Sequence, residues 1–355
     1  VGPSVRGADG TWGAVAPVSQ AGEDVQAGEV NGGIGGDGIA TMLWATPGGF
    51  CFSVLRPDGT WTDAASQTEP NEQYDGVAMA PSADGGTTMV TTGSIAGDRR
   101  VRVYTRAANS LTYSLSHDFD ESDVDPPSSP SIAFNSSGEG VAIWRSMNSD
   151  ELRFARFTGG SWEAPDTALT GVDSPPRVAV NGDGAAAAIW GDSGFAHAET
   201  AVMATDGSWS SVHSMPNDSP NVYFPDIAAD GNGTFVTAWQ AFDIQNYATV
   251  PAHTFTSEWS GGDWTDPEQI TGGLSGAPML SVNGSGDMLL AMGTGSLQSV
   301  KPGAAFRPSG GDWGPVETIS QGNADIGPNG LVMGGLSADG DAAIAYLDAD
   351  TPVRT

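Results

Sequence analysis

Aromatic side chains gather in three short stretches that also carry carboxylates, amides and a histidine. The stretches are NVYFPD at 221–226, QAFDIQNY at 240–247 and GDSGFAH at 191–197. Aromatic rings stack on the apolar faces of sugars, while Asp and Asn accept hydrogen bonds from hydroxyl groups. The candidate ligand-binding residues are Phe195, His197, Tyr223, Phe224, Phe242, Asp243, Tyr247 and Arg145. The alternative is that these rings only fill the ends of the fold.

A second chemistry is indicated by the acidic run HDFDESDVD at 117–125. Ca²⁺ takes six to eight oxygen ligands, and such a loop supplies carboxylates. The candidate metal ligands are Asp118, Asp120, Asp123 and Asp125. No complete calcium-loop spacing is present, so solvated loop carboxylates are the alternative.

Other catalytic signatures do not occur in the sequence. The four histidines, at 117, 197, 213 and 253, show no HExxH or other paired spacing, which argues against a catalytic transition metal. The chain contains neither a G-x-S-x-G elbow nor a P-loop. Two loop carboxylates could form a glycosidase acid–base pair, but spacing in sequence does not set their separation in space.

The charge balance limits the possible partners. With 13 basic and 43 acidic residues the net charge is −30, which argues against nucleic acid and anionic membrane surfaces. An acidic surface also keeps a protein soluble outside the cell, and this alone is a sufficient explanation of the charge.

Cys51 is the only cysteine, and its place in the apolar run CFSVL predicts a buried thiol rather than a disulfide. No stretch approaches the roughly 18 apolar residues of a membrane helix, so we expect no membrane insertion. The sequence starts at Val1 rather than Met, which suggests a processed secreted form or a piece of a longer protein. We therefore expect an extracellular or cell-surface location.

The elements that position these residues are repeats. A tryptophan follows a glycine-containing turn at 12, 61, 162, 209, 264 and 313, with intervals of 49, 101, 47, 55 and 49. The long interval spans two periods, with a degenerate copy, AANSLTY, around Leu111. A period of about 50 residues is typical of a propeller or array.

A second phrase lies between these turns, as in PSIAFNSSGEGVAIW at 130–144 and PRVAVNGDGAAAAIW at 176–190. It indicates two strands joined by a tight Asn/Asp-Gly turn of the two-residue kind. Each unit therefore holds four short antiparallel strands. Such blades bury both faces only by stacking in a ring.

The pattern predicts one all-β domain over 1–355, a seven-bladed β-propeller of four-stranded antiparallel blades. The expected blades are 31–70, 71–126, 127–174, 175–220, 221–276 and 277–327, with the last one split between the two ends of the chain. Counting from Tyr346 to the end and on from Val1 to Trp12 gives 21 residues, within the spread of the other units. Residues 328–355 would thus supply two inner strands and residues 1–20 two outer strands.

The turn phrase resembles the Asp-box, or bacterial neuraminidase repeat, and the full-length pattern is similar to secreted sialidase-like propellers. The resemblance implies the propeller architecture. A sialidase would also need three converging arginines, a tyrosine nucleophile with a glutamate partner and an aspartic acid, and no local motif marks any of the six tyrosines.

Residues that recur at a repeat position are expected to be structural, and only the others are functional candidates. The recurring tryptophans should pack between blades. Arginines five or six positions before the turn, at 6, 56, 106, 156 and 307, recur as well and should hold the hairpins. The arginines outside this pattern are Arg99, Arg100, Arg102, Arg145, Arg153, Arg177 and Arg354.

Three functions remain open. The first is a non-catalytic, lectin-like module that binds a glycan or a protein surface through long loops on one face. The second is a carbohydrate-active hydrolase or lyase that uses loop carboxylates. The third is a building block of a larger surface assembly. Calcium is the one cofactor that the residues suggest.

Overall fold

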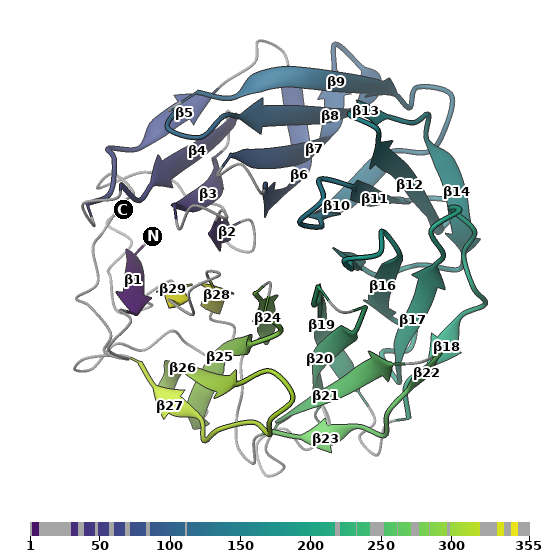
Figure 1. Ribbon diagram of the computed structural model, residues 1–355. Coiled ribbons are helices and arrows are strands. Elements are labelled where there is room, and N and C mark those ends of the chain that lie inside the picture. The colour runs from purple at the N-terminus through teal and green to yellow at the C-terminus, as the bar shows by residue number, and fades with distance from the viewer. Residues whose placement is uncertain are drawn as a thin grey trace.

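The structure is a computed structural model. It describes residues 2–6, 30–34, 39–46, 49–56, 60–67, 72–82, 86–110, 112–216, 221–231, 233–241, 252–260, 262–270, 277–283, 285–296, 299–319, 332–336 and 342–346. All regular elements in these ranges are β-strands, and they form antiparallel sheets arranged in a ring (Figure 1). The fold is a β-propeller.

Six sheets are blades of four or more strands. Blade 1 contains β2 (Val30–Ile34), β3 (Ala40–Thr46), β4 (Gly49–Val54) and β5 (Ala65–Gln67). Blade 2 contains β6 (Glu72–Pro81), β7 (Thr87–Ile95), β8 (Asp98–Arg106) and β9 (Ser114–Asp120). Blade 3 contains β10 (Pro127–Phe134), β11 (Gly140–Ser146), β12 (Glu151–Thr158), β13 (Ser161–Trp162) and β14 (Asp166–Thr170).

Blades 4 to 6 follow in the same order around the ring. Blade 4 contains β15 (Arg177–Val180), β16 (Ala186–Gly191), β17 (Ala198–Met203) and β18 (His213–Ser214). Blade 5 contains β19 (Val222–Ala229), β20 (Phe235–Ala241), β21 (His253–Ser260), β22 (Asp263–Trp264) and β23 (Glu268–Gln269). Blade 6 contains β24 (Met279–Val282), β25 (Met288–Ser296), β26 (Ser299–Arg307) and β27 (Glu317–Thr318).

The two ends of the chain meet in a three-stranded sheet, which we call the terminal sheet. It contains β1 (Gly2–Arg6), β29 (Ala342–Tyr346) and β28 (Val332–Leu336), in that order. β1 pairs antiparallel with β29, from Gly2 opposite Tyr346 to Arg6 opposite Ala342.

The predicted set of seven four-stranded blades is wrong, because the structure has six blades. The terminal sheet has three strands in the part of the chain that the structure describes, with one N-terminal strand, β1, where the sequence pattern predicts two. A repeat count registers every copy of a sequence phrase, but it does not show whether each copy completes a sheet.

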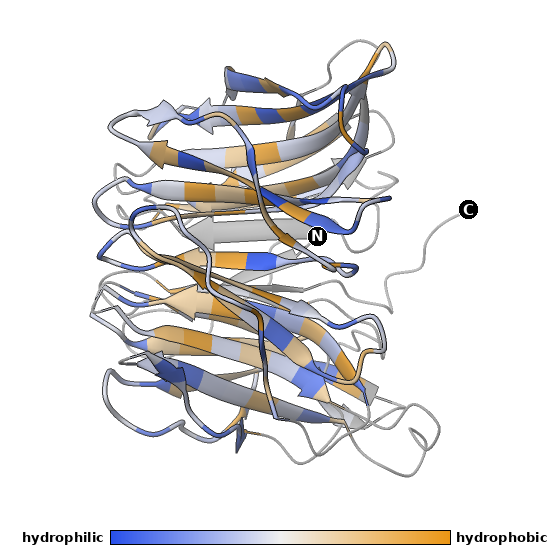
Figure 2. Ribbon diagram, turned by 90° about the vertical axis from the view of Figure 1, so that its right-hand side faces the viewer, coloured by the Kyte–Doolittle hydropathy of each residue, from blue (hydrophilic) through white to orange (hydrophobic). Residues whose placement is uncertain are grey.

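The core lies between neighbouring blades. The second strands are largely buried, and Trp44, Trp144, Trp190 and Trp239 on these strands are at most 1% exposed. Apolar segments run through the strands, whereas many hydrophilic residues lie in the loops at the two faces of the ring (Figure 2). Cys51 is buried in β4, as predicted.

Aromatic side chains from the outer hairpins pack against five of these interfaces. They are Tyr113, Trp162, Trp209, Trp264 and Trp313. The predicted packing role of the turn tryptophans is therefore confirmed for these four. Tyr113 takes the position in blade 2, where the sequence has the degenerate copy of the repeat.

The turns between first and second strands, such as 181–185, lie at one end of the ring, which we call the turn face. The fully described turns at 135–139 and 181–185 are not two-residue turns. Asn181 N donates to Ala185 O over 2.9 Å, which leaves three loop residues, the last of them Gly184 with φ +84°. The Asn181 carboxamide oxygen accepts from the amides of Asp183 and Ala185, and this side-chain capping favours the longer loop.

Neighbouring turns touch at this face. A Cβ atom on Gly182 would lie 2.3 Å from the carbonyl oxygen of Gly231 in the next blade. Asn135 Nδ2 donates to Asn181 O at 3.0 Å, and Asn181 Nδ2 donates to Gly233 O at 3.3 Å. Blades 3, 4 and 5 are thus tied together at the turn face. The opposite end, which we call the loop face, carries the segments that link second to third strands and one blade to the next.

The recurring arginines hold the outer hairpins. Arg56 donates to Trp61 O at 3.0 Å, Arg106 to Ser110 O at 3.0 Å and Arg307 to Gly311 O at 2.6 Å. Arg156 instead reaches Thr205 O in the next blade, at 2.8 Å.

In the described residues the structure shows no helix that is long and apolar enough to cross a membrane.

Candidate functional site

Two of the innermost strands begin at the loop face with the same bulge. The register shifts between Ser128 and Ser131 in β10, and between Tyr223 and Asp226 in β19. Ser129 and Phe224 occupy the same place in this bulge, both precede a proline, and both have φ 50°. The backbone is therefore repeated while the side chain differs, so the scaffold does not require an aromatic ring at position 224.

The loop between β16 and β17 presents a second exposed ring, that of Phe195. The Asp192 carboxylate accepts from the amides of Ala196 and His197, at 2.5 and 3.1 Å, and Asp192 O accepts from Phe195 N at 2.8 Å. This closed loop holds Phe195 at φ 54°, a conformation that is unusual for a bulky residue. The side chain of His197 is exposed at the same loop.

Phe195 and Tyr223 stack across the seam between blades 4 and 5. Their ring centroids are 5.2 Å apart and their planes lie 10° from parallel. Phe224 adjoins Tyr223 with a centroid distance of 6.1 Å, and the amide of Val222 donates to the carbonyl of Phe195. We call Phe195, Tyr223 and Phe224 the aromatic cluster. Phe195 is 43% exposed and Phe224 51% exposed, so the cluster offers ring surface to solvent at the loop face.

A buried carboxyl lies three residues beyond Tyr223 in the chain. Asp226 Oδ2 accepts the amide of Leu280 in blade 6 at 2.7 Å. Burial raises the pKa of Asp226, and the nearby Arg177 charge and backbone hydrogen bonds lower it in part. Ser131 has the same place in blade 3 and accepts the amide of Val178 at 3.1 Å. Asp226 therefore also ties two blades together.

Arg177 begins β15, the innermost strand of blade 4. Ala179, two residues further along and on the same face of the strand, packs in the interface with blade 5. Arg177 therefore faces blade 5, where its charge acts on Asp226. Among the arginines whose side chains the structure describes, it is the one without a hydrogen bond or ion pair to another described side chain or backbone group. Sequence reasoning placed Arg177 only among the arginines outside the repeat pattern.

Arg145 lies one blade away from the aromatic cluster, near the loop-face end of β11. Its guanidinium pairs with Asp150, and its Nε is buried without a hydrogen-bond partner. The structure places it with blade 3 rather than with Phe195 and Tyr223.

The carboxylates of the acidic run at 117–125 do not point toward a common centre. Asp118 and Asp120 lie on β9 and face Arg100, with Asp120 3.4 Å from that guanidinium, and Asp118 also contacts Arg102 at 3.3 Å. Asp125 accepts from Asn148 at 3.2 Å, and Asp123 is exposed. No group of three acidic, His or Cys side chains in the described ranges is arranged to hold a metal ion.

Phe242, Asp243 and Tyr247, like Trp12 and Leu111, lie outside the described residues.

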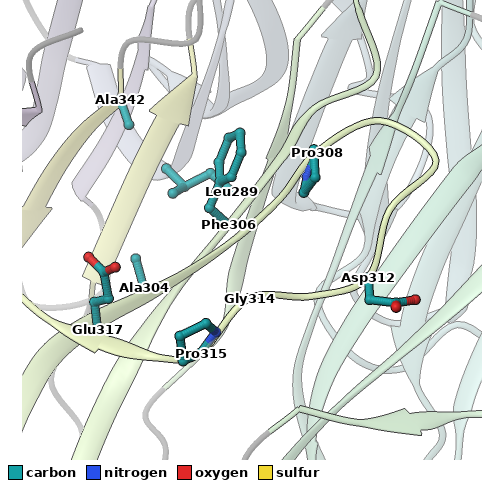
Figure 3. A pocket seen from close by; sticks show the side chains of 9 residues that line it. All are labelled: Leu289, Ala304, Phe306, Pro308, Asp312, Gly314, Pro315, Glu317 and Ala342. Carbon is teal, nitrogen blue, oxygen red and sulfur yellow. The ribbon is translucent and has the colours of Figure 1, made fainter. Parts of the chain in front are cut away.

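A cavity of about 310 Å³ lies between blade 6 and the terminal sheet (Figure 3). Its lining is mostly apolar, with Leu289, Ala304, Phe306 and Ala342 on the inner side and Asp312 and Glu317 at the rim. Five other interfaces receive a Trp or Tyr that follows the turn of an outer hairpin, whereas the described residues of this interface include none, and Phe306 on β26 is the aromatic that packs there. The cavity therefore corresponds to a packing position of the repeat, and we do not assign it to a ligand.

No protein-family model and no curated protein sequence matches the chain. Among solved structures, it is similar to a PL25 polysaccharide lyase, an ulvan lyase bound to -[GlcA(1-4)Rha3S]-, at 12% identity, TM-score 0.56 and coverage of 92% of this chain and 90% of that one. It is also similar to a protein of unknown function from Dyadobacter fermentans, at 9% identity, TM-score 0.51 and coverage of 90% and 93%. The NanB sialidase from Streptococcus pneumoniae aligns at 11% identity and TM-score 0.46, over 90% of this chain and 65% of that one. The first two similarities support the propeller fold, and they do not establish an activity.

Proposed function

We propose that the protein is an extracellular glycan-binding propeller whose aromatic cluster is the sugar platform. The stacking of Phe195 on Tyr223, beside the exposed ring of Phe224, carries the proposal. Parallel, partly exposed rings offer the flat apolar surface on which a sugar ring packs.

The backbone supports the same conclusion. Phe195 and Phe224 both occupy the left-handed region, which costs a bulky residue about 1–2 kcal/mol. Phe195 and Phe224 stay about half exposed, so apart from their contacts with Tyr223 they return little burial for the strained backbone. Such features persist where a site needs a fixed geometry.

The test is a glycan array with the wild type and Tyr223→Ala. We expect binding to at least one glycan, and a loss of roughly tenfold or more in affinity in the variant, as for the removal of an aromatic contact residue. Leu115→Ala is the matched control, because Leu115 is an exposed apolar residue on the outer strand β9 of blade 2. Equal binding by wild type and Tyr223→Ala would refute the site.

A second candidate is a carbohydrate-active hydrolase or lyase at the same seam. The upward shift of the Asp226 pKa favours it, because a general acid must hold its proton to a higher pH than an ordinary aspartate does. Turnover of a polysaccharide panel by the wild type, abolished in Asp226→Asn, would support it. Unchanged turnover in the variant would exclude Asp226 as the acid.

A further inference from the structure

Among the arginines whose side chains the structure describes, Arg177 is the one that no hydrogen bond or ion pair holds in place. The other arginines with described side chains all bond to a carbonyl, a hydroxyl or a carboxylate, as Arg153 does with Glu121 at 2.9 Å. A guanidinium presents five donors in a planar fork that matches a carboxylate. An Arg left without such a partner at an inner strand is available to a ligand.

The distance from the aromatic cluster suits one sugar unit. Arg177 pairs with Ile189 on β16. Gly191 lies two residues further on, and a Cβ atom there would be about 4 Å from both the Phe195 ring and the carbonyl of Val222. Two strand residues span about 7 Å. A sugar stacked on the rings therefore places a substituent within reach of the guanidinium.

The neighbouring carboxyl of Asp226 does not form an ion pair with Arg177. Asp226 bonds to the amide of Leu280 rather than to Arg177, and its burial favours the neutral form. Asp192, a carboxylate at the same seam, is engaged with the amides of its own loop.

We propose that Arg177 binds the carboxylate of a uronic acid residue whose ring stacks on the aromatic cluster. This inference rests on the proposed glycan-binding function and specifies its ligand class. The net charge of −30 opposes long acidic polymers, so the recognition is local, through one carboxylate at one arginine.

The experiment compares four-residue oligomers of galacturonate, glucuronate and mannuronate with their methyl esters by calorimetric titration. The ester lacks the charge and carries one added methyl group on each carboxyl. For at least one sugar we expect the acid to bind roughly 10- to 100-fold more tightly than the ester, as for a hydrogen bond to a charged group. Arg177→Gln should lower the affinity for the acid to that for the ester. The affinity of Arg177→Lys for the acid should lie between those of the wild type and Arg177→Gln.

Lys301→Gln removes one positive charge from β26 of blade 6 and is the control for net charge. It should keep the preference for the acid. Equal affinities of acid and ester in the wild type, or a preference that survives in Arg177→Gln, would overturn the proposal. If ester and acid both bind through Tyr223 without distinction, the uronate assignment fails while the glycan site stands. If neither binds and the array is also negative, the glycan-binding function itself fails.

Discussion

Arg153 holds both carboxylate oxygens of Glu121, with Nε 2.9 Å from Oε2 and Nη2 3.0 Å from Oε1. The same carboxylate accepts from the indole of Trp144 at 3.2 Å, and Glu121 is 2% exposed. It lies in the linker between blades 2 and 3, so this buried group joins the two blades.

Glu121→Ala should therefore destabilise the protein by about 3 kcal/mol, because it leaves the Arg153 charge without its partner. Urea unfolding measures the change. Asp120→Ala is the control, since the Asp120 side chain is mostly exposed and its ion pair with Arg100 contributes little. A Glu121→Ala variant as stable as Asp120→Ala would show that the buried pair adds nothing.

Phe224→Gly should raise stability and remove binding at once. Glycine adopts a positive φ without the penalty of a side chain, so we expect about 1 kcal/mol of stabilisation. Ser129→Gly changes the equivalent bulge in blade 3 and should give a similar gain without affecting glycan binding. Thermal unfolding and the glycan array measure the two effects. Loss of binding in both variants would mean that the bulge, and not the ring, matters.

Asp226 should make stability fall as the pH rises. Its folded pKa lies above the ordinary value of 3.8, so between these two values the folded state binds more protons than the unfolded state. Below pH 3.8 the folded and unfolded states are both protonated at this site and the effect vanishes. Asp226→Asn should thus gain stability relative to the wild type as the pH rises from 3.8 through the folded pKa of Asp226. A difference that is constant across the pH series would contradict the buried, protonated form.

Asn135 and Asp230 occupy the same position in the turns of blades 3 and 5. The Asn135 side chain donates to the next blade, whereas a carboxylate can only accept. Asp230→Asn should therefore stabilise the protein by about 1 kcal/mol, and Asn135→Asp should destabilise it by at least as much. The two reciprocal changes, followed by urea unfolding, are each other's controls. If both substitutions changed the free energy of unfolding in the same direction, the side-chain N–H donor would not be the cause.

The repeat pattern in the sequence predicts the hairpins well. The phrases at 130–144 and 176–190 cover most of β10 with β11 and of β15 with β16, because small apolar runs around a turn have few other ways to bury both faces. The pattern also separates packing tryptophans from the off-pattern aromatics, and three of those aromatics do come together at one seam.

The sequence could not predict which charged groups are buried or partnered. Glu121 lies within a run of acidic residues that suggests solvated loops, yet it is enclosed by Arg153 and Trp144. Arg177 and Arg153 are equally off-pattern, but only Arg153 meets a carboxylate. These differences arise from contacts between blades, which depend on how one sheet is placed against the next.

Blades 3, 4 and 5 cannot separate at the turn face without breaking the contacts of Gly182 with Gly231 and of Asn135 with Asn181. A ligand that needs more room must therefore pivot the blades about these fixed ends. Displacement grows with distance from a pivot, so even a small tilt is largest at the aromatic cluster. The bond between the Val222 amide and the Phe195 carbonyl spans that opening, and its hydrogen-exchange rate would be the first to report the movement.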